Sequence, residues 1–107
     1  MSDDNDAVVT VLWEAKAKPG REQEMKAFMT NAVTASRADA GCIEYEAHEV
    51  IGEPGTFVIF ERWISKRHLD AHLGAARMQD LVPQLLELMQ GSIEGGIRLL
   101  KAFRPSA

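Results

Sequence analysis

The stretch TFVIFERWI, residues 56–64, constrains the fold more than any other part of the sequence, because it is bulky and apolar on both sides. Side chains alternate across a β-strand, so this stretch would present two sets of residues to opposite sides. One set is Phe57, Ile59, Glu61 and Trp63, and the other is Val58, Phe60, Arg62 and Ile64. Neither set suits direct contact with water. We therefore predict a strand in a sheet that is covered on both faces.

The length and charge of the chain indicate a single domain and argue against a protein that binds nucleic acid or membranes. The chain has 107 residues, enough for one hydrophobic core but not for two. We expect a disordered tail over residues 1–7 and a single domain over residues 8–104. The formal net charge of -4 argues against binding to nucleic acid or to an anionic membrane surface. No stretch approaches the roughly 20 apolar residues of a transmembrane helix, and no signal peptide is apparent.

Cysteine and histidine usage adds two expectations. The single cysteine, Cys42, excludes an internal disulfide and suits the reducing cytoplasm, where we expect the protein to be. The three histidines and this thiol show none of the spacings of a metal site. We therefore expect no bound metal.

Hydrophobic periodicity divides the chain into alternating strands and helices. The predicted strands cover residues 8–18, 42–51, 56–64 and 93–103. The predicted helices cover residues 21–38, a short segment capped by Ser65 and ending at Leu73, and residues 75–90. Within the last strand, Gly95 and Gly96 predict either a bulge or a close backbone approach. The order is that of the ferredoxin-like, split βαβ arrangement, an α+β fold with a four-stranded antiparallel sheet and helices on one face.

The second face of this sheet would be bare in a monomer. It carries Val58, Phe60 and Ile64, and soluble monomers rarely expose an apolar patch of this kind. Burial of apolar surface stabilises a complex by roughly 25 cal/mol per Å², which favours pairing of two sheets across a two-fold axis. We predict a homodimer formed through the sheet face.

The short helix brings an ionisable side chain to the covered face. A helix that starts after Ser65 places Leu69, His72 and Leu73 along one stripe. If this stripe folds back onto the preceding strand, His72 meets Glu61 and Trp63. A carboxylate, an indole and an imidazole would then converge in one largely apolar place.

With these residues identified, the chain resembles the antibiotic-biosynthesis-monooxygenase family, the dimeric α+β barrel proteins, over nearly its whole length. The matching features are Lys18-Pro19-Gly20, Ala40-Gly41-Cys42, Tyr45, and Glu61-Arg62-Trp63 followed by His72 nine residues after the tryptophan. The resemblance implies a cofactor-free monooxygenase of electron-rich aromatic substrates, or a quinol oxidase, with molecular oxygen as the second substrate. It also implies a pocket between the sheet and the helices of each protomer.

An oxidation of this kind needs a dry pocket, removal of a proton, and an anion that passes an electron to oxygen. We assign His72 as the base, because its ordinary pKa lies near neutrality, and expect Glu61 to orient His72 or to take the proton itself. Trp63 completes the predicted catalytic group and, with Trp13, would wall the pocket. The predicted substrate-binding residues are Trp13, Tyr45 as a hydrogen-bond donor, Leu69 and Met78.

Structural roles for the same residues are the alternative. Trp63 could be core, His72 a hydrogen-bonded core or capping group, Glu61 the partner of an arginine, and Tyr45 part of the dimer interface. The family also includes haem-degrading members, which carry an asparagine where this chain has Trp13, so haem cleavage is disfavoured. Two other functions stay open: an isomerase of a sugar phosphate or keto acid, and a non-catalytic dimer that binds a small molecule such as haem.

Overall fold

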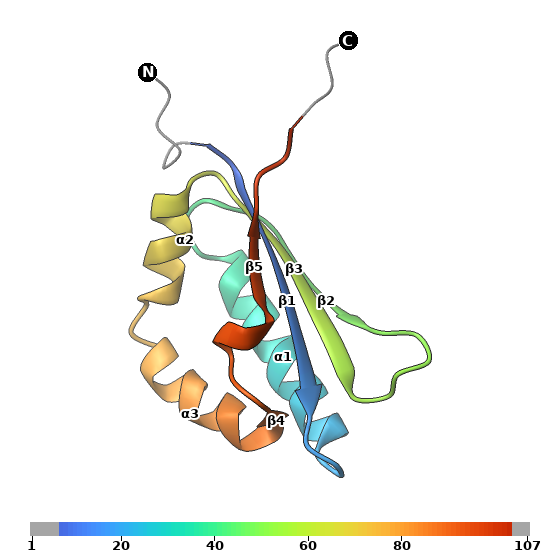
Figure 1. The fold of residues 1–107 in the computed structure, drawn as a ribbon. Helices are drawn as coiled ribbons and strands as arrows, with labels where there is room; N and C mark the ends of the chain where they lie inside the picture. The colour runs from blue at the N-terminus through green and yellow to red at the C-terminus, as the bar shows by residue number, and fades with distance from the viewer. Residues whose placement is uncertain (1–6, 104–107) are drawn as a thin grey trace.

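The structure is a computed structural model and describes residues 7–103 (Figure 1). Its elements are β1 (Val9–Ala17), α1 (Glu22–Arg37), β2 (Cys42–Glu49), β3 (Thr56–Trp63), α2 (Lys66–Leu73), α3 (Met78–Leu88), β4 (Met89–Gln90), the 3-10 helix η2 (Glu94–Gly96) and β5 (Ile97–Leu100). This order confirms the predicted α+β, ferredoxin-like fold, although the sheet within the described residues has five strands and not the predicted four. The tail predicted over residues 1–7 lies outside the described residues except for Ala7, and so do residues 104–107.

A single antiparallel sheet places β1 and β3 at its centre. The strand order is β2-β3-β1-β4, and β5 also pairs with β1. In the central pair, Val11 lies opposite Glu61 and Trp13 lies opposite Ile59. The three described α-helices lie together on one side of this sheet, as Figure 1 shows. The core and the site described below both lie between these two layers.

Strand alternation decides which side chains enter the core. Along β1, the buried residues are Val11, Trp13, Ala15 and Ala17, and along β3 the fully apolar ones are Phe57, Ile59 and Trp63. The helices pack methionine and leucine side chains against this face, including Met25, Met29, Leu69, Leu85 and Leu88. The helix-facing set predicted for residues 56–64 is therefore confirmed.

The C-terminal part of the sheet differs from the predicted single strand over residues 93–103. Two short strands pair with the same edge of β1: β4 with Lys16 and Ala17, and β5 with residues 10–13. Between β4 and β5, η2 passes so close to β1 that a Cβ atom on Gly96 would lie 2.0 Å from the carbonyl oxygen of Glu14. Only glycine fits there. Gly96 therefore marks a close backbone approach and not a bulge, and β5 begins only after it.

α2 begins where the sequence predicts. The Oγ atom of Ser65 accepts a hydrogen bond from the backbone N–H of His68 at 3.2 Å, which caps the helix. Leu69 and His72 are buried on the helix face that packs against the sheet, with exposed fractions of 2% and 4%. Leu73, predicted on the same stripe, is 53% exposed, because it is the last residue of the helix and lies at the rim of the layer.

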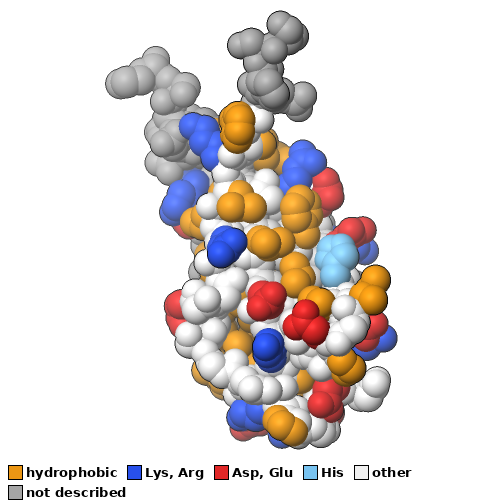
Figure 2. Space-filling view, turned by 45° about the vertical axis from the view of Figure 1, so that its right-hand side comes forward, with side chains coloured by type: hydrophobic (Ala, Val, Ile, Leu, Met, Phe, Trp, Pro, Cys, Tyr) orange, Lys and Arg blue, Asp and Glu red, His pale blue; other side chains and the backbone are white. Residues whose placement is uncertain are grey.

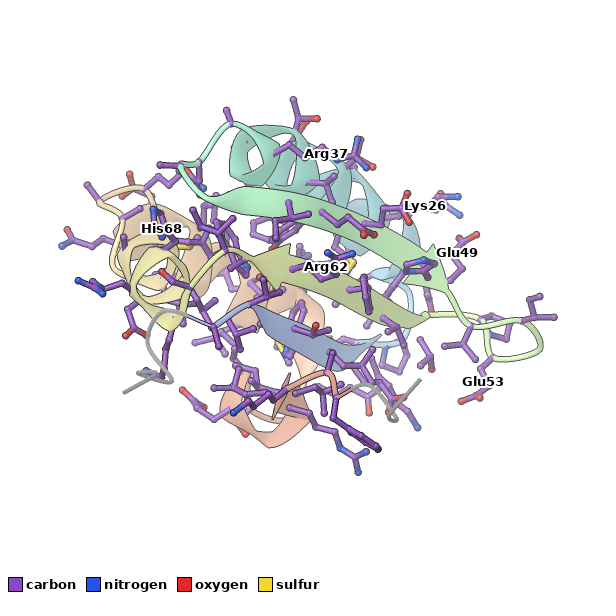
Figure 3. All side chains as sticks on the ribbon, turned by 90° about the horizontal axis from the view of Figure 1, so that it is seen from above. Lys26, Arg37, Glu49, Glu53, Arg62 and His68 are labelled. Carbon is purple, nitrogen blue, oxygen red and sulfur yellow. The ribbon has the colours of Figure 1, made fainter. Side chains whose placement is uncertain are left out.

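The opposite end of the molecule is a hairpin held to α1. Lys26 of α1 and Glu49 at the end of β2 form an ion pair at 3.1 Å, and Glu53 lies in the turn beyond it (Figure 3). His68 of α2 lies at the other end of the molecule in this view. Both side chains of the ion pair are more than half exposed, so the pair adds little stability.

The sheet face without helices is apolar along its middle, as predicted. Leu12, Val58 and Phe60 are only partly buried, and Ile64 is 46% exposed. Arg62 also lies on this face, where its Nη1 atom donates to Oε1 of Glu44 at 2.8 Å. Figure 2 turns part of this side toward the reader and shows hydrophobic side chains gathered among charged ones.

Candidate functional site

A cavity of about 160 Å³ lies between the sheet and the layer formed by α2, α3 and the segment before β5. Most of its wall is apolar and comes from aliphatic side chains such as Val11, Leu69 and Met78. The polar exceptions are Tyr45, Glu61 and His72. A second hollow of about 80 Å³ adjoins it, and Trp13, Tyr45 and Met78 line both spaces. A phenol, a carboxyl group and an imidazole therefore face an otherwise apolar cavity.

The imidazole of His72 is buried and fixed on two sides. Its Nδ1–H donates to Oδ2 of Asp39 at 2.7 Å, because an ionised carboxylate can only accept. The ring stacks on Trp63 with a centroid distance of 4.6 Å and meets Tyr45 edge-on at 5.6 Å. Burial lowers the pKa of His72 below its ordinary value, although the bond to Asp39 opposes this change. His72 is therefore a neutral base near pH 7.

The carboxylate bonded to His72 is that of Asp39, so the predicted orientation of His72 by Glu61 is wrong, whereas the alternative that Glu61 takes the proton itself stays a prediction. Asp39 lies in the turn between α1 and β2, where Arg77 binds it with both terminal nitrogens; the Nη1–Oδ1 distance is 2.9 Å. The bond from Arg77 holds the pKa of Asp39 below its ordinary value. Neither Asp39 nor Arg77 was predicted from the sequence. They stand 33 and 38 positions from their partners, in a turn and a linker without a motif.

Glu61 is bonded instead to its neighbour on the same strand face. Its Oε1 atom accepts a hydrogen bond from the indole N–H of Trp63 at 2.8 Å, and only 6% of the residue is exposed. Burial raises the pKa of Glu61 to about 7, and the bond from Trp63 only partly offsets this rise. A group that both holds and releases a proton near neutrality is thus placed in the cavity wall.

Only one of the two tryptophans lines the cavity. Trp63 is fully buried behind Glu61 and His72 and does not line the cavity, so it forms no wall for a ligand. Trp13 does line the cavity, but its indole N–H is taken by the carbonyl oxygen of Ile93 at 3.0 Å. Trp13 therefore offers a ligand its ring and not a hydrogen bond.

The remaining predicted ligand-binding residues all reach the cavity. Leu69 of α2 and Met78 of α3 contribute apolar wall, and Tyr45 of β2 lies beside His72 and Trp63. Burial raises the pKa of the Tyr45 phenol, with the nearby Glu61 adding to the effect. Tyr45 therefore keeps its proton.

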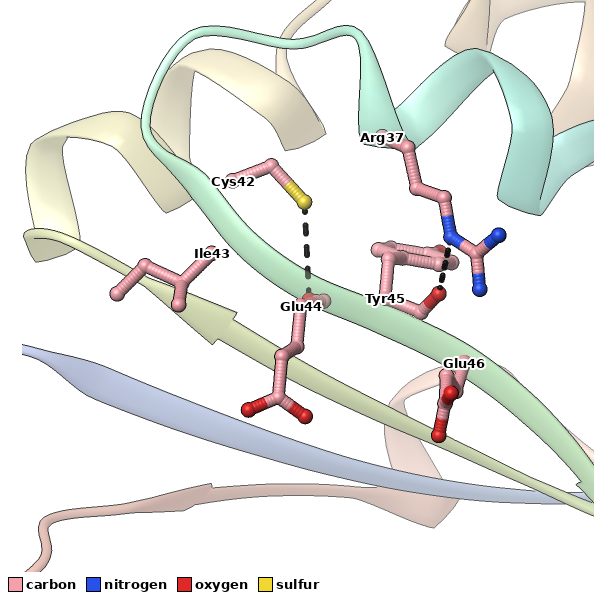
Figure 4. A pocket seen from close by; sticks show the side chains of 6 residues that line it. All are labelled: Arg37, Cys42, Ile43, Glu44, Tyr45 and Glu46. Carbon is pink, nitrogen blue, oxygen red and sulfur yellow. Dashed lines mark hydrogen bonds between the residues drawn. The ribbon is translucent and has the colours of Figure 1, made fainter.

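A more open hollow of about 350 Å³ lies at the outer edge of β2, away from this cavity (Figure 4). There the Nε atom of Arg37 donates to the carbonyl oxygen of Tyr45 at 2.9 Å. The Cys42 thiol faces the carbonyl oxygen of Glu44, and burial raises its pKa. A thiol with a raised pKa is a poor nucleophile, so this hollow shows no group prepared for chemistry.

The described residues contain no cluster of three or more histidine, cysteine, aspartate or glutamate side chains that could hold a metal ion. None of the described helices is long and apolar enough to cross a membrane.

The chain is similar to several known proteins. The family model described as "Antibiotic biosynthesis monooxygenase" matches residues 8–84. "Putative monooxygenase YcnE" of Bacillus subtilis is 30% identical over 79 residues, covering 74% of this chain and 83% of that protein. "Putative monooxygenase Rv0793" of Mycobacterium tuberculosis is 30% identical over 81 residues, covering 76% of this chain and 79% of that protein.

Solved structures share the fold. The structure of Rv0793 has a TM-score of 0.82 at 25% identity and covers 94% of this chain and 100% of its own. A structure from Deinococcus radiodurans, described as a "putative antibiotic biosynthesis monooxygenase", has a TM-score of 0.74 and covers 94% of each chain. At 19% identity the second likeness concerns the fold alone.

Proposed function

Because the chain belongs to the antibiotic biosynthesis monooxygenase family, we propose that it oxidises a small phenol or hydroquinone with molecular oxygen and without a cofactor. The resemblance found in the sequence is thereby confirmed at the level of the family. The substrate class and the roles of single residues are our proposal. The observation that carries it is the placement of His72 and Glu61 together in the wall of an apolar cavity.

The size of the cavity supports a substrate with one aromatic ring. An apolar cavity of about 150 Å³ is known to accept benzene, and the cavity here measures about 160 Å³. The adjoining hollow beyond Met78 gives room for a substituent. The ring of Trp13 supplies a flat surface against which an aromatic ligand can stack.

His72 begins the proposed reaction by accepting the proton of a substrate hydroxyl at Nε2. The anion that results passes an electron to oxygen more readily than the neutral phenol does. For a hydroquinone, loss of two electrons and two protons gives the quinone, and oxygen takes up both pairs to become hydrogen peroxide. In a monooxygenation of a phenol, one oxygen atom of O2 enters the ring and the other leaves as water. The substrate supplies all four electrons and becomes the quinone, so that phenol and O2 give quinone and water.

Glu61 and Tyr45 complete the proposed chemistry. A carboxyl group with a pKa of about 7 can donate a hydrogen bond to a substrate oxygen or exchange a proton with it. The phenol of Tyr45 stays protonated and can donate as well. Trp63 holds Glu61 through the 2.8 Å hydrogen bond and supports the ring of His72, so we assign it a positioning role.

Oxygen uptake with a panel of hydroquinones and phenols tests this proposal. We expect consumption of oxygen with at least one substrate and a loss of about 10²-fold or more in kcat in His72→Ala. His48→Gln is the matched control for loss of an imidazole, because His48 is exposed on β2 and does not line the cavity. Since His48 lies beside Val58 on the sheet face of the predicted dimer, sedimentation of this variant is compared with that of the wild type. Wild-type rates in His72→Ala would remove His72 as the base, and no uptake with any member of the panel would count against the substrate class.

The two alternative functions have less support. A sugar-phosphate isomerase needs a cation for the phosphate, and no lysine or arginine is among the described residues that line the cavity. Activity that persists without oxygen would nevertheless favour it. Haem needs more space than about 160 Å³, since pockets for ligands of drug size are roughly 300–1,000 Å³. A Soret shift on titration with haem would favour that reading.

We further propose a cytoplasmic homodimer formed through the uncovered sheet face. The lone thiol supports the location. The partly buried side chains of Leu12, Val58 and Phe60 support the interface, because a second copy would remove them from water. Sedimentation at micromolar concentration tests the dimer, and a monomer at that concentration would contradict it.

A further inference from the structure

We propose that Asp39 and Arg77 are positioning residues for the reaction. Asp39 keeps the proton of His72 on Nδ1, which leaves Nε2 free to accept a proton, and Arg77 holds Asp39 in place. The inference rests on the proposed role of His72 as the base. Neither Asp39 nor Arg77 lines the cavity, so both would act through His72 and not by contact with a ligand.

The contact between Asp39 and His72 supports the first part of the proposal, that Asp39 keeps the proton of His72 on Nδ1. The Nδ1–Oδ2 distance is 2.7 Å, and the His72 side chain is only 2% exposed. Within residues 7–103, this is the one hydrogen bond found for the imidazole ring. A buried imidazole with a single fixed carboxylate partner at Nδ1 has a defined tautomer. Its basic nitrogen is therefore Nε2.

The contacts of Arg77 support the second part of the proposal, that Arg77 holds Asp39 in place. Arg77 lies in the linker between α2 and α3, next to the cavity residue Met78, and binds both carboxylate oxygens of Asp39. Paired binding of this kind fixes the plane of a carboxylate as well as its position. The carboxylate therefore joins the turn before β2, helix α2 and the linker before α3, and its angle to the imidazole is set from outside the cavity.

Asp39 and Arg77 change the pKa of His72 through their charges. Asp39 from the turn and Arg77 from the linker face the ring together with Tyr45 from β2 and Glu61 from β3. Asp39 favours the imidazolium, whereas Arg77 disfavours it by its own charge and by neutralising Asp39. Removal of the carboxylate and removal of the guanidinium should therefore change the basicity of His72 in opposite directions.

Nitrogen-15 NMR of the histidine rings tests the proposal without any substrate. In the wild-type protein, we expect His72 to show a protonated Nδ1 and an unprotonated Nε2 above its pKa. Asp39→Asn should lower the pKa of His72, and Arg77→Gln should raise it, each by about one pH unit. Matched controls are Asp70→Asn, which breaks the exposed pair with Lys66 on the same helix, and Arg21→Gln, which breaks the exposed pair with Glu24.

The wild-type spectrum keeps the test valid even if a variant fails to fold. A proton on Nε2 of the wild-type ring would overturn the proposal, and so would pKa changes of the same sign in the two variants. If an oxidation is found, Asp39→Asn should lower kcat about 10²-fold with little change in KM, because Asp39 does not line the cavity. Opposite pKa changes without any oxygen uptake would support the positioning roles and reject the proposed oxidation.

Discussion

Replacement of Glu61 by glutamine should change how the stability of this protein depends on pH. Glu61 is 6% exposed, and its carboxyl group accepts a hydrogen bond from the Trp63 indole that the amide oxygen of glutamine can also accept. Glu61→Gln therefore removes the ionisation and keeps the shape. Glutamine has no charged form that burial can penalise.

The magnitude follows from the pKa of Glu61 in the two states. In the unfolded chain the group ionises near 4.5, and in the folded protein near 7. Below pH 4.5, both states are protonated and the wild-type protein has its full stability. As the pH rises from 4.5 to 7, only the unfolded chain ionises, so the wild-type free energy of unfolding falls. At about 1.4 kcal/mol per pH unit, the loss reaches about 3 kcal/mol and then levels off.

Urea denaturation at fixed protein concentration between pH 4.5 and pH 8 measures this effect. His72 and Asp39 have lowered pKa values and destabilise the fold at acidic pH, but they do so equally in both proteins. The difference between Glu61→Gln and wild type isolates Glu61. It should grow by about 3 kcal/mol in favour of the variant as the pH rises. Glu87→Gln, an exposed substitution on α3, should show no such trend.

A difference that stays flat across this pH range would refute the reasoning. It would mean that Glu61 ionises alike in the folded and unfolded states, and the argument that it exchanges a proton near neutrality would be lost. A difference that grows in favour of the wild-type protein would mean that the carboxylate form is stabilised in the fold by a partner.

Three further outcomes are expected. Gly96→Ala should destabilise the protein by at least about 2 kcal/mol in urea, because its Cβ would meet the backbone of Glu14, whereas Gly95→Ala faces only a serine hydroxyl and should cost less. Trp13→Phe should cost about 1 kcal/mol, because it loses the indole hydrogen bond to a backbone carbonyl; an unchanged melting temperature would contradict this. Phe60→Ser should shift the proposed dimer toward monomer in sedimentation, and an unchanged sedimentation coefficient would exclude Phe60 from the interface.

Local patterns in the sequence were sufficient for most of the fold. Alternation of side chains placed Phe57, Ile59, Glu61 and Trp63 on one face, and Ser65 marked the start of α2. These features depend only on residues that are neighbours along the chain, so they can be predicted from the sequence alone. The shortened last strand was missed because it depends on how closely residue 96 passes β1, which is a tertiary distance.

For the site, the sequence by itself determined that an imidazole and a carboxyl group would face the same layer, because the periods of a strand and a helix fix which way side chains point. It did not determine their partners. The tertiary structure decided that Asp39, from a turn, binds the buried ring of His72, that Arg77, from a linker, binds Asp39, and that Trp63 lies behind Glu61 and not against the cavity. The contacts of Asp39 with His72 and Arg77 join segments more than thirty residues apart, and only the packing of the helices on the sheet brings those segments together.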